Sequence, residues 1–359
     1  MTNTPTDKQH YAWIDYAKCF SIILVIAFHC PGWNKGGYMG DLLQLLRMPA
    51  FFLIAGYLFR IEKFKSLWAF IRHRSIQLLI PFTSFFIIFY ILWVSFGRRL
   101  TGGEELDIPI YMPIIEFIKG TPVTVVATYW FIACLLSMQI IYYLSRKFLP
   151  RSLSVIFILA GPFIYDMPIV NQLPWNIPRA LQYLPFYAFA NIYKDYITNL
   201  GKSSLPKVVI PLIVTLFGLT IVHQVPTPLQ APLRILLGLC ILPTYILIIK
   251  GLSKVVNYRK NISGVSSAIN ATAAYIGRNT IVILAVQNYI IGFIKILFAS
   301  SIIQIESAED YTMAKFALNI AITLVTIITS IPIIYLINKY IPWFIGRGAF
   351  WKRKLQQYS

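Results

Sequence analysis

The chain has 359 residues, of which 57% are hydrophobic and only 13% are charged, and its mean hydropathy is +0.67. About a quarter of the residues in an ordinary soluble domain are charged, so this composition excludes a soluble globular protein. The formal net charge of +19 would by itself suggest nucleic-acid binding. The positions of the charges indicate a lipid bilayer as the partner instead and give no reason to expect nucleic acid.

Long apolar runs predict about ten membrane spans, because an α-helix needs about 20 apolar residues to cross a bilayer. The spans are expected at residues 13–30, 42–59, 77–97, 124–144, 152–166, 179–193, 208–224, 231–249, 272–294 and 314–338. The fifth and sixth are short and adjoin prolines, so a tilted, broken or re-entrant helix is expected for each. The expected fold class is an all-α, polytopic membrane helix bundle.

The basic residues give an orientation for this bundle. If the N-terminus is cytoplasmic, the connections on its side carry 21 Lys and Arg residues, and those on the opposite side carry 6. This bias follows the positive-inside rule and alternates at every connection, as ten spans require. We therefore expect both termini in the cytoplasm, with an N-terminal tail at 1–12, a transmembrane domain at 13–341 and a basic C-terminal tail at 342–359.

Several kinds of soluble-enzyme site are missing from the sequence. The phosphate loop, GxSxG, HExxH and dinucleotide motifs are all absent. The cysteines lie inside apolar runs without paired spacing, which predicts small buried hydrophobes and no disulfide framework or zinc site. No metal is expected. The first apolar run ends without a small-x-small cleavage site, which predicts a retained first span.

Ionisable residues inside spans are costly and are functional candidates. The first span contains Asp15, Lys18 and His29. Eleven residues make about three helical turns, so Lys18 and His29 are expected on one helix face, about 16 Å apart along the axis. Lys18 would lie at the inner end of this face and His29 at its outer end. The alternative is that Lys18 extends to the headgroups and His29 is an interfacial histidine.

Polar residues near the ends of other spans extend the candidate site. Arg47 precedes Met48-Pro49 at the outer end of the second span, where it could hold an anionic or carbonyl oxygen or simply anchor the helix. Arg179 is expected to face the same outer cavity. The remaining candidates are Trp130, Gln182, Arg278 and Asn279. Trp130 also fits an interfacial aromatic belt, and Arg278 also fits the positive-inside pattern.

Two of these motifs together resemble a known family. They are a basic residue, ten residues and a histidine in the first span, and R-M-P-x-F-F-x-x-x-G-Y-L-F from Arg47 to Phe59. This pair resembles the membrane-bound acyltransferase family 3, which also has a ten-helix core. YWFI at 129–132, RALQYLPFYAFANIY at 179–193 and IGRNT at 276–280 look most like the fucose O-acetylase type of stand-alone members. Lys18 stands where many members have Arg, and Gln287 where many have His.

The resemblance implies transfer of an acyl group, usually acetyl from acetyl-CoA, to a hydroxyl of a bacterial surface glycan, such as lipopolysaccharide, or of its lipid-linked precursor. It also implies a multi-pass protein of the bacterial cytoplasmic (inner) membrane. His29 is then the expected catalytic residue, as general base or acyl carrier, with Lys18 as its motif partner and Arg47 as a supporting residue. The expected substrate-binding residues are Asp15, Trp130, Arg179, Gln182, Arg278 and Asn279.

Two other readings of the sequence stay open. A transporter or flippase for a glycan or its precursor could have the same ten spans and the same inner positive bias. A non-catalytic membrane subunit is the second alternative, because Gln287 replaces the second histidine of the family. The acceptor sugar, the acyl chain and the oligomeric state have no signal in the sequence.

Overall fold

The computed structural model describes residues 12–33, 37–100, 104–200, 206–259, 264–307, 312–348 and 350–351, and the regular elements in these ranges are all helices. This confirms the all-α membrane class. Within these ranges seven helices or helix pairs are long and apolar enough to cross a membrane: Ala12–His29, Tyr38–Leu58, Leu67–Gly97, Val123–Phe148, Thr227–Val256, Thr280–Leu297 and Met313–Tyr340. Arg151–Ile164 and Val209–Ile221 are shorter apolar helices.

The helices of the first half of the chain are α1 (Ala12–His29), α2 (Tyr38–Arg47), α3 (Pro49–Leu58), η1 (Ile61–Lys63), α4 (Leu67–Leu92), η2 (Trp93–Gly97), α5 (Arg98–Leu100), η3 (Glu104–Asp107), α6 (Met112–Ile118), α7 (Val123–Val126), η4 (Ala127–Tyr129), α8 (Trp130–Phe148) and α9 (Arg151–Ile164). Those of the second half are α10 (Pro168–Asn171), α11 (Ile177–Ile192), α12 (Lys194–Asn199), α13 (Pro206–Ile221), α14 (Thr227–Arg259), α15 (Gly264–Arg278), α16 (Thr280–Leu297), α17 (Ala299–Glu306), α18 (Met313–Tyr340) and η6 (Pro342–Ile345).

Two of the expected spans are interrupted. The second consists of α2 and α3, which meet at Met48, because Pro49 has no N–H to continue the hydrogen bonds of α2 and instead starts α3. The ninth, expected as one helix over 272–294, is broken at Asn279 between α15 and α16, which corrects the sequence-based boundary. At this break the Asn279 side chain accepts hydrogen bonds from Asn338 and Arg347.

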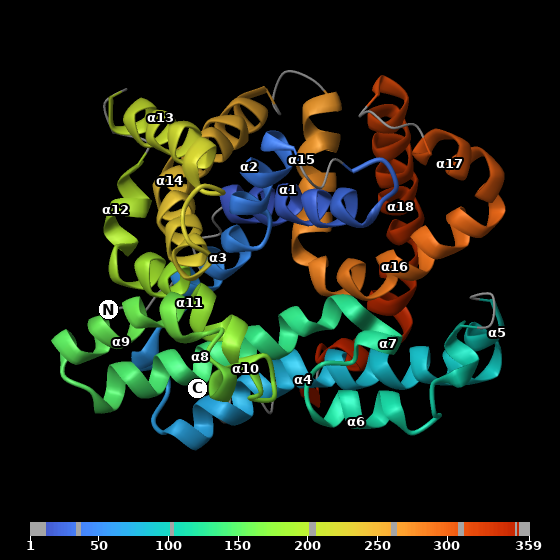
Figure 1. Ribbon diagram of the computed structural model, residues 1–359, viewed down its shortest axis with the longest axis horizontal. Coiled ribbons are helices and arrows are strands. Elements are labelled where there is room, and N and C mark those ends of the chain that lie inside the picture. Colours follow the sequence, from blue (N-terminus) through green and yellow to red (C-terminus); the bar gives the residue numbers. More distant parts are fainter. Residues whose placement is uncertain are drawn as a thin grey trace, which may run out of the picture.

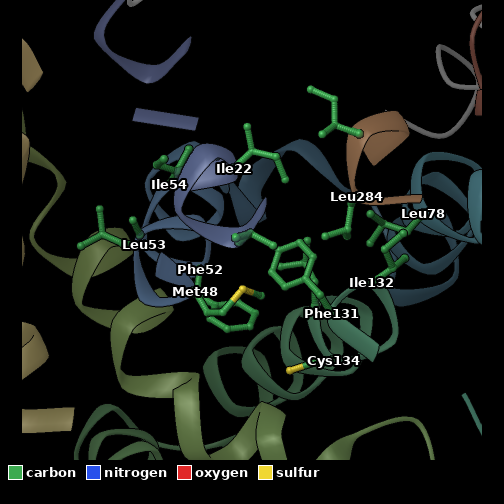
Figure 2. Packing of buried hydrophobic residues seen from close by; sticks show 14 of the residues in the cluster. Ile22, Met48, Phe52, Leu53, Ile54, Leu78, Phe131, Ile132, Cys134 and Leu284 are labelled. Atoms are coloured by element: carbon green, nitrogen blue, oxygen red, sulfur yellow. The ribbon is translucent and has the colours of Figure 1, made fainter. Parts of the chain in front are cut away.

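Helix α1 lies near the centre of the molecule, with α13 and α14 on one side and α17 and α18 on the other (Figure 1). It packs against α3, α14, α15, α16 and α18. In the adjoining core, the ring centroids of Phe52 on α3 and Phe131 on α8 are 5.2 Å apart, and Met48 lies beside them (Figure 2). The central place of α1 explains how both its ends reach sites formed by several other helices.

Several close helix contacts depend on glycine, and two of them involve α1 and α3. A Cβ on Gly56 of α3 would collide with the main-chain oxygen of Tyr187 on α11, and a Cβ on Gly277 of α15 would collide with that of Asp15 on α1. These glycines allow backbones to approach as they do at tight contacts between membrane helices.

The described start of the expected C-terminal tail packs on the bundle. Phe344 of η6 is buried, and its ring centroid is 4.9 Å from that of Phe85 on α4. Residues 1–11, 349 and 352–359 of the two expected tails lie outside the described residues. Residues 342–348 therefore belong structurally with the transmembrane helices.

Candidate active site

A cavity of about 260 Å³ lies at the end of α1 where His29 is the last residue. Five parts of the chain line it, with residues Val25, Phe28, His29, Arg47, Met48, Thr128, Trp130, Arg179, Tyr183 and Leu284. We call it the His29 cavity. It contains the three residues expected from the sequence to lie at the outer side, namely His29, Arg47 and Arg179, together with the candidate Trp130.

The break between α2 and α3 places Arg47 in the cavity. Arg47 is the last residue of α2, and its guanidinium carbon lies 3.5 Å from the ring centroid of Phe28. The Phe28 ring in turn meets the His29 ring edge to face, with centroids 5.2 Å apart. Phe28 thus lies beside both the guanidinium and the imidazole and limits their positions.

A second arginine lines the same cavity. Arg179 is in the first turn of α11, and its guanidinium carbon lies 4.5 Å from the ring centroid of Trp130, the first residue of α8. Such cation–π contacts hold a guanidinium in place while leaving its N–H groups free to point at a ligand.

The His29 cavity carries excess positive charge. Within the described ranges, the ion pairs join Asp41 to His223 and Arg234, and Asp15 to Arg278. Neither Arg47 nor Arg179 takes part in any of them, and no carboxylate lines the cavity. Two such guanidinium groups suit a ligand atom that is, or becomes, negatively charged.

Two polar lining residues were missed by the sequence analysis. Tyr183 follows Arg179 by four residues on α11 and therefore shares its helix face, a spacing that could have identified it. Thr128 donates a hydrogen bond through Oγ1 to the main-chain oxygen of Leu284, at 2.6 Å. No pattern in the sequence indicated Thr128. Gln182 lies instead at a separate cavity of about 50 Å³, together with Gln44, Tyr183 and Arg234.

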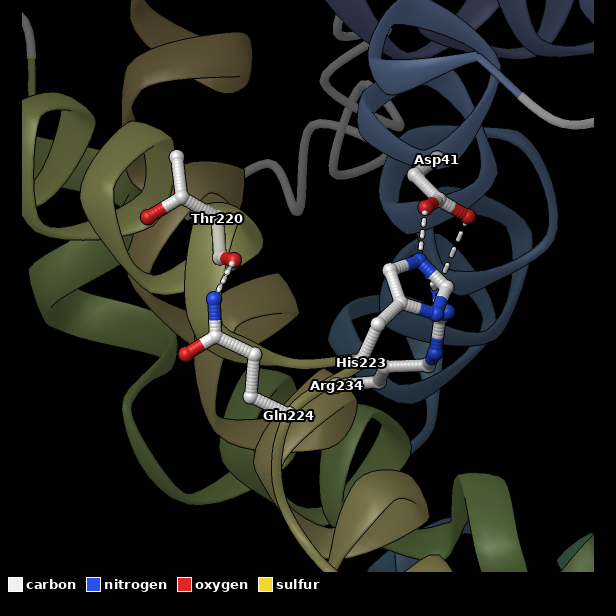
Figure 3. Close-up of polar contacts among 5 residues, drawn as sticks. All are labelled: Asp41, Thr220, His223, Gln224 and Arg234. Atoms are coloured by element: carbon white, nitrogen blue, oxygen red, sulfur yellow. Dashed lines mark hydrogen bonds and ion pairs between the residues drawn. The ribbon is translucent and has the colours of Figure 1, made fainter.

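An ionic cluster supports α2 at the same end of the molecule. Asp41 accepts hydrogen bonds from His223 Nε2, at 2.7 Å, and Arg234 Nη1, at 3.0 Å (Figure 3). Because Asp41 and Arg47 are both on α2, these contacts help to fix the helix that presents Arg47. The sequence analysis did not anticipate this cluster, whose members are far apart in the chain.

The other predicted site residues gather at the opposite end of α1. Arg278 Nε donates to Asp15 Oδ2, at 2.9 Å. Arg347 donates to Asn279 Oδ1, at 2.8 Å, and to the main-chain oxygen of Arg278, at 2.7 Å. Lys18 lies within the electrostatic range of Asp15 and Arg347. We call these five residues the Lys18 cluster.

Partial burial has an electrostatic consequence in the Lys18 cluster. Desolvation lowers the pKa of the Arg347 guanidinium from its ordinary value, although the group stays charged at neutral pH. Three cations and one carboxylate meet here, so the cluster favours an anion.

Lys18 and His29 are on one unbroken helix, as expected, but Lys18 does not line the His29 cavity.

Gln287 occupies a wholly buried position on α16. In the described part of the chain neither its Oε1 nor its Nε2 has a hydrogen-bond partner. The hydroxyl of Tyr129, also wholly buried, lacks one too. Buried polar atoms of this kind are normally satisfied by water or ligand.

Among the described residues, no group of three or more His, Cys, Asp or Glu side chains could hold a metal ion.

Comparison with known proteins gives one match. A family model described as an acyltransferase domain matches residues 11–339, which is most of the chain. No curated protein and no solved structure gives a significant match.

Proposed function

The chain belongs to the membrane-bound acyltransferase family 3, and from this premise we propose that it transfers an acetyl group from acetyl-CoA to a hydroxyl of a bacterial surface glycan or its lipid-linked precursor. The observation that carries the proposal is the His29 cavity, which one imidazole lines together with two arginines that form no ion pair in the described ranges. Acyl transfer to an alcohol requires a proton acceptor together with a positive site for an oxyanion.

In the proposed reaction, neutral His29 takes the proton of the acceptor hydroxyl as its oxygen bonds to the thioester carbonyl carbon. The carbonyl oxygen becomes an oxyanion, which Arg47 and Arg179 stabilise through charge-assisted hydrogen bonds. Collapse of this intermediate breaks the C–S bond. The leaving thiolate receives the proton from the His29 imidazolium, so the enzyme returns to its starting state.

The donor is proposed to approach from the Lys18 end. Lys18, Arg278 and Arg347 supply positive charge to attract its phosphates. The rise of α1 between Lys18 and His29 is about 16 Å, so an extended thioester arm has to reach the His29 cavity from that end. Asn279 and Asp15 then act by holding the arginines of the cluster.

An alternative within this proposal makes His29 an acyl carrier. His29 would attack the thioester first, and the acceptor hydroxyl would then attack the acyl-imidazole. Rapid quenching of the enzyme with radiolabelled acetyl-CoA and no acceptor separates the two routes. Label bound to wild-type protein, and absent from His29→Ala, indicates the carrier, whereas unlabelled wild type indicates the general base.

Mass spectrometry of surface glycans tests the function itself. Cells with the intact chain should show glycans heavier by one acetyl group than cells without it or cells with His29→Ala. His73→Ala is the matched control, since it removes an imidazole that lies beside the Phe64 ring, outside the His29 cavity. Full acetylation in His29→Ala would overturn the proposal, and unmodified glycans retained inside deficient cells would indicate a flippase.

A further inference from the structure

A second cavity, of about 390 Å³, lies beside the His29 cavity. Its lining is mostly apolar and comes from η2, from residues 123–127 and from α16. The η2 segment is a π-helical turn that continues α4, and its Trp93, Phe96 and Gly97 all line the cavity. Such turns widen a helix and are frequent at functional sites. We call this space the η2 cavity.

The two cavities are separated by one thin wall. Ala127 lines the η2 cavity, whereas the next residue, Thr128, lines the His29 cavity. On α16, Asn288 lines the η2 cavity and Leu284, one helical turn away, lines the other. The hydrogen bond from Thr128 to Leu284, both of which line the His29 cavity, connects the two chain segments that form this wall. A ligand in the η2 cavity would therefore lie next to the His29 cavity.

Two polar groups of the η2 cavity can accept hydrogen bonds from a ligand. Trp93 Nε1 donates to Glu105 Oε2, at 2.7 Å, and so fixes the carboxylate at the cavity. The Oδ1 atom of Asn288 is buried and has no hydrogen-bond partner among the described residues. Hydroxyl groups of a ligand would satisfy both, while a phosphate group would be repelled by the carboxylate.

The rest of the η2 cavity suits an apolar chain. Phe96, Phe293 and Ile296 line it and are about half exposed or more, so the cavity opens on the apolar surface of the bundle. Gly292 leaves space there, because no heavy atom lies within 4 Å of the position that a Cβ on it would take. A lipid chain can thus enter from the bilayer without crossing a polar surface.

We propose that the η2 cavity holds a neutral glycolipid acceptor, with the apolar chain along α16 and sugar hydroxyls on Glu105 and Asn288. A more distant hydroxyl of the same molecule would then reach the His29 cavity across the Thr128–Leu284 wall. This inference rests on the proposed acyl transfer and extends it by naming the acceptor as a membrane-held glycolipid.

Photo-crosslinking tests the site independently of catalysis. The full chain in nanodiscs is labelled with dodecyl glucoside that carries a diazirine in its alkyl chain. We expect labelled peptides around residues 288–296, and loss of this label when unlabelled dodecyl glucoside, but not phosphatidylglycerol, is added in excess. Label elsewhere, or equal competition by phosphatidylglycerol, would overturn the proposal in favour of ordinary bilayer lipid.

Gly292→Phe should fill the cavity and lower this labelling at least tenfold. Gly251→Phe is the matched control, because a Cβ on Gly251 also meets open space but Gly251 lies on α14, away from the cavity. Should Gly292→Phe fail to fold, Asn288→Leu keeps the number and branching of the side-chain heavy atoms, removes the Oδ1 acceptor and should lower labelling several-fold. Wild-type labelling of a folded Gly292→Phe or Asn288→Leu variant would overturn the proposal.

A transfer assay connects the site with acylation. Methyl and dodecyl glycosides of the same sugar are compared as acceptors, and Gly292→Phe should lower kcat/KM for the dodecyl glycoside about tenfold more than for the methyl glycoside. An equal loss for both glycosides would overturn the proposal. Crosslinking as expected, without transfer to either glycoside by the wild type, would overturn the proposed function and still support a glycolipid site.

Discussion

The two ends of α1 hold their charges in different ways. At the His29 end, Arg47 and Arg179 rest on the rings of Phe28 and Trp130 and form no ion pair in the described ranges. At the Lys18 end, Arg278 bonds to Asp15, and the neighbouring Arg347 bonds to main-chain and amide oxygens. A guanidinium that lies on a ring face keeps its N–H groups available for a ligand. A guanidinium that donates to protein oxygens uses most of its N–H groups to join helices. The first end is therefore suited to chemistry and the second to anchoring and donor attraction.

The largest expected difference between the two ends concerns His29. His29→Ala should lower the rate of acyl transfer by about 10²–10⁴-fold, because a positioned proton acceptor contributes that much. Turnover of purified protein with acetyl-CoA measures the effect, and the melting temperature in detergent serves as the control. An inactive protein with a melting temperature far below wild type would show that His29 acts through folding.

Arg47 should show the next largest effect. Arg47→Lys keeps the charge but loses the planar group that lies on Phe28, and we expect kcat to fall by about 10²-fold, as on loss of an oxyanion donor. Arg72→Lys is the matched control, since Arg72 also lies near an aromatic ring, that of Trp68, outside the cavity. Unchanged kcat in Arg47→Lys would remove a planar contact from the mechanism.

The Lys18 end should respond in stability more than in kcat. Asp15→Asn removes the buried carboxylate that Arg278 contacts, and because Arg278 is 56% exposed the cost should be only about 1 kcal/mol. The expected result is a melting temperature lower by a few degrees, with kcat per folded molecule close to wild type. A double-mutant cycle with Arg278→Gln measures the coupling, and a coupling near zero would contradict the anchoring role.

The smallest effect is expected for the cluster that supports α2. Asp41→Asn weakens its contacts with His223 and Arg234, so Arg47 should be positioned less well and kcat should fall a few-fold. The KM for acetyl-CoA should not change, because the donor is proposed to enter at the other end. A raised KM with unchanged kcat would place Asp41 in donor binding.

Much of the architecture could be predicted from the sequence because hydropathy and charge are local properties of the chain. Apolar runs indicated α1, α4, α14 and α18 as membrane helices, and the structure contains all four. The family, too, was recognisable from motifs within two neighbouring spans. Helix breaks were harder to predict, since Asn279, which lies at the break between α15 and α16, accepts a hydrogen bond from Arg347, 68 residues later in the chain.

The sequence by itself determined the class of the protein, its family and the identity of His29 and Arg47 as candidates, because each depends on composition or on residues close together in the chain. Only the tertiary structure decided which candidates share a cavity. It joined Arg179 and Trp130 to His29, and it placed Lys18, Asp15, Arg278 and Asn279 in a separate cluster. The physical reason is that helix packing, including close contacts such as that of Gly277 with Asp15, sets the distance between side chains that belong to different helices.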